Sequence, residues 1–246
     1  TATKTRAILR HHFDEYLQYG GFPEGINLPS KRDYLMSVYQ KIYLGDIAAR
    51  HRIENAFALR FLFKKLSESI MQPLSFTRLA NLITSTGCKI SKATVINYME
   101  YAKDSYLIFS IKNIASHIAE REGNPKYYFV DNGIISLLTL NAESALLENM
   151  VAMELMRRYG QDNQVFFYND KVEVDFYIPE TGTAIQVSMY PHESNETWRR
   201  ETEALVRMNK HLPCSTHLLL TMNEEDTIII DGITIHMIPI WKWLLN

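Results

Sequence analysis

The chain is poor in the residues that build covalent or metal-held frameworks. Only two of its 246 residues are cysteines, Cys88 and Cys214, and their distance in sequence excludes a disulfide framework and a zinc ribbon. The eight histidines have no metal-ligand spacing, and the adjacent His11 and His12 would point about 100° apart on a helix. A reducing, cytoplasmic setting is therefore expected.

Long apolar runs and glycine-rich phosphate loops are also missing. The apolar runs are too short to cross a membrane, and the first residues do not resemble a secretion signal, so no membrane partner is expected. None of the ten glycines lies in a GxxxxGK[ST] or GxGxxG pattern, so we expect no nucleotide site. Because the chain lacks an initiator Met, we expect it to be a fragment of a longer protein.

The charges that are present are unevenly distributed. Residues 1–130 hold 18 Lys and Arg against 11 Asp and Glu, whereas residues 131–246 hold 8 against 17. Affinity for nucleic acid comes largely from neutralised phosphates. The first segment is therefore charged to bind DNA, and the second is poorly charged for it.

Residues 1–73 are expected to form a helical segment. The three helices are expected over 5–19, ending at Gly20-Gly21, over 31–49 after Ser30 as N-cap, and over 54–72, closed by Pro73. The third helix is apolar on so many sides that it is expected to be buried.

Residues 74–135 have the pattern of a winged helix. A short amphipathic helix over 75–83, a turn and a helix capped by Ser91 give a helix-turn-helix, and runs at 107–114 and 126–130 would form the wing. The second helix would present Lys92, Thr94, Asn97 and Lys103 to a DNA groove. Residues 75–130 hold only seven Lys and Arg against four Asp and Glu, so the alternative is a module that packs neighbouring domains together.

Residues 136–246 are expected to form an α/β domain with the αβββαβ order of the restriction-endonuclease-like fold. The elements are a helix at 143–159, strands at 164–169, 172–178 and 184–190, a helix at 196–211, a strand at 216–222 and a hairpin turning at Asp231-Gly232.

The hairpin from Glu173 to Ser188 carries the candidate site. Asp175 on one strand and Gln186 on the next can converge at one end of a sheet. Metal-dependent nucleases hold Mg²⁺ with such oxygens, and a Lys two residues further on steadies the attacking water. The hairpin resembles the PD-(D/E)xK signature, with Asp175 as its acid, Gln186 as its second ligand and Ser188 in place of the Lys. Because a hydroxyl cannot supply the charge of a Lys, the chemistry is expected to be impaired.

The resemblance also implies Glu148, on the first helix of this domain, as a metal ligand together with Asp175. Glu154 borders the same apolar stripe and is the rival position. Structural interpretations stay open beside these roles: Glu148 as a solvated helix residue, Asp175 as an outward-facing strand residue, and Gln186 as a hydrogen-bond partner of Asp175 or the backbone.

Several segments, in the expected order, resemble one family. They are residues 13–24, 91–101, 128–133 and 147–149 and the hairpin at 173–188. The family is a group of prokaryotic AAA-type ATPases of unknown role, in which a P-loop domain precedes a winged helix and a restriction-endonuclease-like domain. The resemblance covers nearly the whole chain and implies that it is the C-terminal portion of such a protein, with ATP bound only by the missing N-terminal domain.

Three functions follow from these patterns. The first is a non-catalytic DNA- or protein-interaction region of such an ATPase, with the P-loop domain, other proteins or DNA as partners. The second is an active Mg²⁺-dependent nuclease in which Lys171 replaces the lost Lys. The third is a DNA-binding regulator that works through the winged helix. Ser188 and the acidic second half of the chain favour the first, in which the chain itself is not an enzyme.

Overall fold

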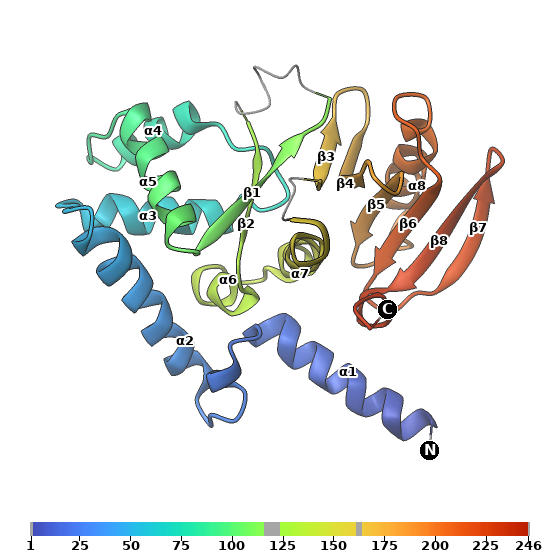
Figure 1. Cartoon of the computed structure of the whole chain (residues 1–246), viewed down its shortest axis with the longest axis horizontal. Helices are drawn as coiled ribbons and strands as arrows, with labels where there is room; N and C mark the ends of the chain where they lie inside the picture. Colours follow the sequence, from blue (N-terminus) through green and yellow to red (C-terminus); the bar gives the residue numbers. More distant parts are fainter. Residues whose placement is uncertain (1, 116–123, 161–163, 246) are drawn as a thin grey trace. The chain divides into compact units, whose positions relative to one another are not determined.

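The computed structural model in Figure 1 describes residues 2–115, 124–160 and 164–245. It is a mixed α/β chain that divides into two compact units. The helical unit comprises residues 14–110 and 126–142, and the sheet unit comprises residues 1–13, 111–125 and 143–246.

The helical unit contains most of the helices. Its elements are the end of α1 (Ala2–Tyr19), η1 (Pro23–Gly25), α2 (Lys31–Gln40), η2 (Lys41–Ala49), α3 (Ala56–Ser67), α4 (Phe76–Ser85), α5 (Lys92–Asp104), the start of β1 (Ile108–Asn113), β2 (Lys126–Phe129) and α6 (Asn132–Leu138).

Local sequence signals account for most of these helix boundaries. α1 ends where Gly20 adopts a φ of +75°. The hydroxyl of Ser91 caps α5 by accepting the N–H of Thr94, as predicted. The hydroxyl of Ser75 caps α4 in the same way by accepting the N–H of Arg78. Ser30 does occupy the N-cap position of α2, but its hydroxyl accepts no backbone N–H.

The helix predicted over 31–49 is confirmed as one helical segment, although η2, its second half, has the wider π-helical winding. One expectation for this unit was wrong. The helix predicted over 54–72 ends at Ser67, six residues before Pro73. At the end of the helix the Ser67 hydroxyl lies 2.7 Å from that of Thr139, and beyond it Met71 has a φ of +83°, so the chain leaves the helix before it reaches the proline.

The sheet unit is built around a mixed sheet. Its further elements are α7 (Glu143–Tyr159), β3 (Phe166–Asn169), β4 (Glu173–Ile178), β5 (Thr183–Ser188), α8 (Asn195–Met208), β6 (Thr216–Thr221), β7 (Asp226–Ile230), β8 (Ile233–Pro239) and α9 (Ile240–Trp243). From α7 to β8 this is the predicted order of helices and strands, whereas α9 was not predicted.

The strands of this unit run in the order β1-β3-β4-β5-β6-β8-β7. β3, β4 and β5 pair antiparallel, β5, β6 and β8 pair parallel, and β7 returns antiparallel beside β8. The predicted turn at Asp231-Gly232 is confirmed, with φ values of +51° and +78° that suit a two-residue hairpin.

Helices α7 and α8 both pack against β5, which places the predicted hairpin inside the unit. Ala204, Leu205 and Met208 of α8 form a buried core with Val174, Ala184, Leu219 and Met237 of the strands. No helix among the described residues is long and apolar enough to span a membrane.

Candidate functional site

The candidate site begins at an irregularity in β4. Phe166 of β3 pairs with Tyr177, but Tyr168 pairs with Val174, so β4 has one residue more than β3 between these pairs. This is a β-bulge, and Asp175 is one of the two residues that it contains. Bulges bend a strand and redirect its side chains, and this one lies at the acid of the predicted site.

β4 also pairs with β5, on the side away from β3, and next to the bulge side-chain hydrogen bonds replace the backbone pairing between these two strands. The regular pairs run from Ile178 to Phe176, which lies opposite Ile185. Beyond this point the N–H of Asp175 donates to Oε1 of Gln186 at 2.7 Å, and the N–H of Val187 donates to Oδ2 of Asp175 at 2.9 Å. Asp175 and Gln186 are therefore brought together as predicted, and each accepts a backbone N–H that the bulge leaves outside the ladder.

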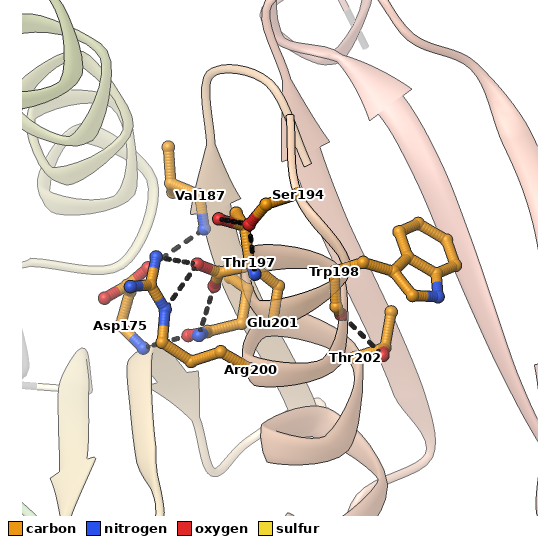
Figure 2. A network of polar contacts seen from close by, with 9 residues as sticks. Asp175, Val187, Ser194, Thr197, Trp198, Arg200, Glu201 and Thr202 are labelled. Atoms are coloured by element: carbon orange, nitrogen blue, oxygen red, sulfur yellow. Dashed lines mark hydrogen bonds and ion pairs between the residues drawn. The ribbon is translucent and has the colours of Figure 1, made fainter. Parts of the chain in front are cut away.

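Glu201 of α8 extends this arrangement into a network, which Figure 2 shows. Nε2 of Gln186 donates to Oε2 of Glu201 at 2.7 Å, so both ends of the amide are used. Nε and Nη2 of Arg200 donate to Oε1 of Glu201 at 3.0 and 2.6 Å. The Glu201 residue is 4% exposed, whereas the Arg200 side chain is 71% exposed and reaches the carboxylate from the solvent side. We call Asp175, Gln186, Arg200 and Glu201 the bulge network.

The electrostatics of the bulge network are those of a buried carboxylate held by one cation. Burial raises the pKa of Glu201, against the bonds from Arg200 and Gln186, and the charge of Asp175 raises it further. The bond to Glu201 raises the pKa of Arg200, and the charges of Asp175 and Glu173 add to this effect against partial burial. Arg200 is therefore the counter-ion of Glu201, and the charges of Asp175 and Glu173 also favour its charged form.

The bulge network fits Mg²⁺ poorly. This ion requires near-octahedral oxygen ligands. Here both ends of Gln186 and both oxygens of Glu201 are engaged in hydrogen bonds, and a guanidinium already supplies positive charge. Within residues 2–115, 124–160 and 164–245, no three His, Cys, Asp or Glu side chains form a group that could hold a metal ion.

Each of the remaining positions of the predicted site has its own surroundings. Glu148 is 1% exposed on α7, so its interpretation as a solvated helix residue was wrong. Its rival Glu154 accepts bonds from Arg157 and Arg158, which lower its pKa although burial acts to raise it. Ser188 is buried at the end of β5, in register with Thr221 of β6.

Sequence reasoning missed Arg200 and Glu201, although a signal for Glu201 was available. Glu201 shares the buried face of α8 with Ala204, Leu205 and Met208, which follow it at helical spacings of three, four and seven. A carboxylate on an apolar face needs a partner, because an unpaired buried charge is very costly. That requirement indicates a polar network beneath α8.

The predicted DNA-reading positions lie on α5 in the helical unit. Lys92 and Asn97 are exposed. Thr94 is half-buried, and its hydroxyl lies 2.8 Å from that of Ser91, within the cap of the helix. Nζ of Lys103 bonds both carboxylate oxygens of Glu100 at 3.2 Å. Two of the four positions therefore have local partners.

A second buried carboxylate joins two segments of the helical unit that are distant in sequence. Oδ2 of Asp131 accepts the N–H of Gly21 at 2.7 Å, and Oδ1 accepts the N–H of Gly133 at 2.8 Å. A Cβ on Gly20 would lie 1.8 Å from Oδ1, so glycine is required there for close approach as well as for its positive φ. Burial raises the pKa of Asp131 to about 6, although both backbone bonds act to lower it.

The neighbours of Asp131 complete this contact. Asn132 donates from Nδ2 to the carbonyl of Leu17 at 3.0 Å, and Ser136 donates to the carbonyl of Gln18 at 2.6 Å. The beginning of α6 thus satisfies the last carbonyls of α1, which have no partner within their own helix.

Two curated relatives match the chain over nearly all of its length. Uncharacterized protein MJ1544 of Methanocaldococcus jannaschii is 32% identical over 258 residues, which cover 100% of this chain and 58% of that protein. An uncharacterized protein of Haemophilus influenzae is 27% identical over 242 residues, which cover 95% of this chain and 58% of that protein. The chain therefore spans 58% of the length of each relative.

A family model also matches the part of the chain that includes the contact between Asp131 and the glycines. It is the model of the Domain of unknown function (DUF8612), and it matches residues 10–145, which is more than half of the chain. The chain therefore belongs to this family.

Proposed function

We propose that this chain is a non-catalytic interaction region of a larger prokaryotic AAA-type ATPase. In this proposal residues 1–73 form a lid-like helical segment, 74–135 a winged helix and 136–246 a degenerate restriction-endonuclease-like domain. The αβββαβ order and the greater length of both relatives support it. ATP would bind only to the P-loop domain of the parent protein, which would also be the first partner of this region.

The observation that carries the proposal is the bulge network. In a working nuclease of this kind, the acid and the second ligand turn their oxygens to a metal ion. Here the oxygen of Gln186 accepts the N–H of Asp175, and the amide holds Glu201, which has Arg200 as its cation. These residues have the connectivity of a structural network between β4, β5 and α8, and Ser188 offers no charge for a transition state.

The winged helix gives weaker support for DNA as a partner. Lys92 and Asn97 are exposed on α5, whereas Lys103 is paired with Glu100. Among the described residues Lys92 has no ion-pair partner, and a single cation on a reading helix neutralises few phosphates. We therefore place protein partners before DNA in the proposed function.

A nuclease assay tests the proposal. The full chain is incubated with plasmid and branched DNA and with RNA in Mg²⁺ or Mn²⁺, beside an Asp175→Ala variant. The proposal requires no cleavage that depends on Asp175. Cleavage by the wild-type chain that disappears in Asp175→Ala would favour the active-nuclease alternative. Lys171, which is exposed before β4, would then be the residue to replace next.

A further inference from the structure

Strand β7 is the outer edge of the sheet in the sheet unit, and Figure 1 shows it as the outermost red strand. It pairs with β8 in regular antiparallel register from Asp226 opposite Met237 to Ile230 opposite Ile233. A strand at an edge presents unpaired N–H and C=O groups that can pair with another strand. Its backbone groups, side chains and charges determine which kind of strand can pair with this edge.

The hairpin turn determines which backbone groups point outward. In a two-residue hairpin, the residues that flank the turn, here Ile230 and Ile233, exchange both hydrogen bonds. Hydrogen-bonded pairs alternate along the ladder, so Ile228 also bonds to β8, while Thr227 and Ile229 direct their N–H and C=O groups away from it. The N–H of Thr227 is accepted by the Asp226 carboxylate at 2.7 Å, which leaves the N–H and C=O of Ile229 at the centre of the outward row.

The side chains of this edge are apolar on both faces of the sheet. Ile228 and Ile230 are half-buried and pack against the core that α8 covers. This core ends at β7. Ile229, on the opposite face, is 70% exposed. A further strand with apolar residues opposite Ile228 and Ile230 would continue the core by one strand.

Acidic side chains lie at both ends of the apolar run. Glu224 is paired with His192, and Glu225 is paired with Lys242. Asp226 and Asp231 are exposed and have no cationic partner in the part of the chain that the structure describes. The edge is therefore a short apolar strand with a negative charge at each end.

This charge pattern selects against a second copy of the chain. An antiparallel pairing of β7 with itself would bring the Glu225–Asp226 end of one copy to Asp231 of the other, and like charges placed opposite each other across strands destabilise the pair. A strand with Lys or Arg at both ends would instead place opposite charges together. Residues 131–246 as a whole hold 8 Lys and Arg against 17 Asp and Glu, which favours the same kind of partner.

We propose that the β7 edge binds an extended segment of a partner protein, apolar at alternate positions and basic at both ends, as an added strand. Backbone hydrogen bonds to Ile229 supply binding, and the pairs with Asp226 and Asp231 supply selectivity. This goes beyond the proposed function, because it concerns the β7 edge and holds whether or not the bulge network is catalytic.

Fluorescence anisotropy with short labelled peptides tests the proposal. The probe is Lys-Val-Thr-Val-Thr-Lys, which in antiparallel register places its two Lys opposite Asp231 and Asp226 and its two Val opposite Ile230 and Ile228. Its matched control has Glu at both ends. Two exposed ion pairs replaced by two like-charge contacts should weaken binding on the order of tenfold or more at low salt. The Asp226→Asn, Asp231→Asn double variant should lose most of this preference, since Asn tolerates the positive φ at position 231 and removes only the charge.

Ile229→Pro then separates an added strand from non-specific attraction. Proline removes the outward N–H of position 229, which is not used in pairing with β8, so the hairpin should persist while binding of the basic peptide is lost. If this variant fails to fold, the basic peptide with N-methylated amides gives the same test on the wild-type chain and should not bind.

Two results would overturn the proposal. The first is equal binding, or no binding, of the basic and acidic peptides by the wild-type chain. The second is a wild-type dimer in light scattering that Ile229→Pro converts to a monomer, because a second copy would then be the occupant of the edge.

Discussion

The replacement Gln186→Leu removes the central amide of the bulge network and leaves a side chain of similar size. Two groups lose their partners: the N–H of Asp175 and the Oε2 oxygen of Glu201. An unmade hydrogen bond at a buried group costs about 1–3 kcal/mol, with charged groups at the upper end. Asp175 is half-buried and belongs to the lower end, whereas the Glu201 carboxylate belongs to the upper end.

These terms give a net effect that is large enough to measure. Burying the leucine side chain returns about 1 kcal/mol of apolar transfer free energy. The expected loss in the free energy of unfolding is therefore about 2–4 kcal/mol near neutral pH.

The pH dependence of this loss identifies the group responsible. Burial already raises the pKa of Glu201, so its contribution to stability is present at low pH and is lost as the pH rises through the folded-state pKa. Removing the Gln186 donor raises that pKa further. The destabilisation by Gln186→Leu should accordingly be smaller at about pH 5 than at about pH 8.

Urea denaturation followed by tryptophan fluorescence is the assay. All three tryptophans, at positions 198, 241 and 243, lie in the sheet unit, so the signal reports on this unit. Gln164→Leu, at a half-buried position before β3, is the control and should change stability by less than about 0.5–1 kcal/mol. A Gln186→Leu variant as stable as wild type at pH 8 would refute the reasoning, because a side chain kept free for a ligand can be replaced without loss in its absence.

Three further predictions concern other charged groups. Arg200→Ala removes the counter-ion of Glu201 and should destabilise the sheet unit by only about 1 kcal/mol at pH 8 in urea denaturation, because the guanidinium is mostly exposed. Arg200→Ala combined with Glu201→Gln should recover part of that loss. Burial raises the pKa of Asp131 from 3.8 to about 6, so its contribution to stability is present below the lower value and lost as the pH rises through the higher one. In urea denaturation followed by circular dichroism, Asp131→Asn should remove this fall in the free energy of unfolding with pH, which amounts to at most about 3 kcal/mol. An unchanged pH dependence would show that another group causes it. In anisotropy titrations with DNA, Lys92→Ala combined with Lys103→Ala should weaken any binding and flatten its salt dependence. The control is a chain with charge changes only around Asp175, which should bind DNA as the wild type does.

The sequence was most informative where local signals and tertiary contacts agree. Ser75 and Ser91 cap their helices, and the Asp-Gly turn between two isoleucine-rich strands forms as predicted, because each signal acts over a few residues. α6 was not predicted. Its N-cap, Asp131, also accepts the N–H of Gly21, which is 110 residues away in sequence. Periodicity in the sequence does not reveal a partner at such a distance.

The candidate site shows the same limit. Strand alternation brought Asp175 and Gln186 together, but the bulge that turns them towards backbone N–H groups depends on the register between β3 and β4. Glu201 and Arg200 come from the following helix, and only the packing of α8 on β5 brings them to the hairpin. Residue types alone predicted Asp175 and Gln186 as possible metal ligands. Only the structure shows that their oxygens are already used in hydrogen bonds.

Titration with Mn²⁺ followed by electron paramagnetic resonance tests the central claim most directly, since it asks whether the bulge network is a metal site or a closed structural network. The full wild-type chain is compared with Asp175→Ala. The account predicts that both bind Mn²⁺ equally weakly, with no saturable site below about 1 mM, because the oxygens of Gln186 and Glu201 are already bonded. A saturable site in the wild-type chain that Asp175→Ala abolishes would contradict it.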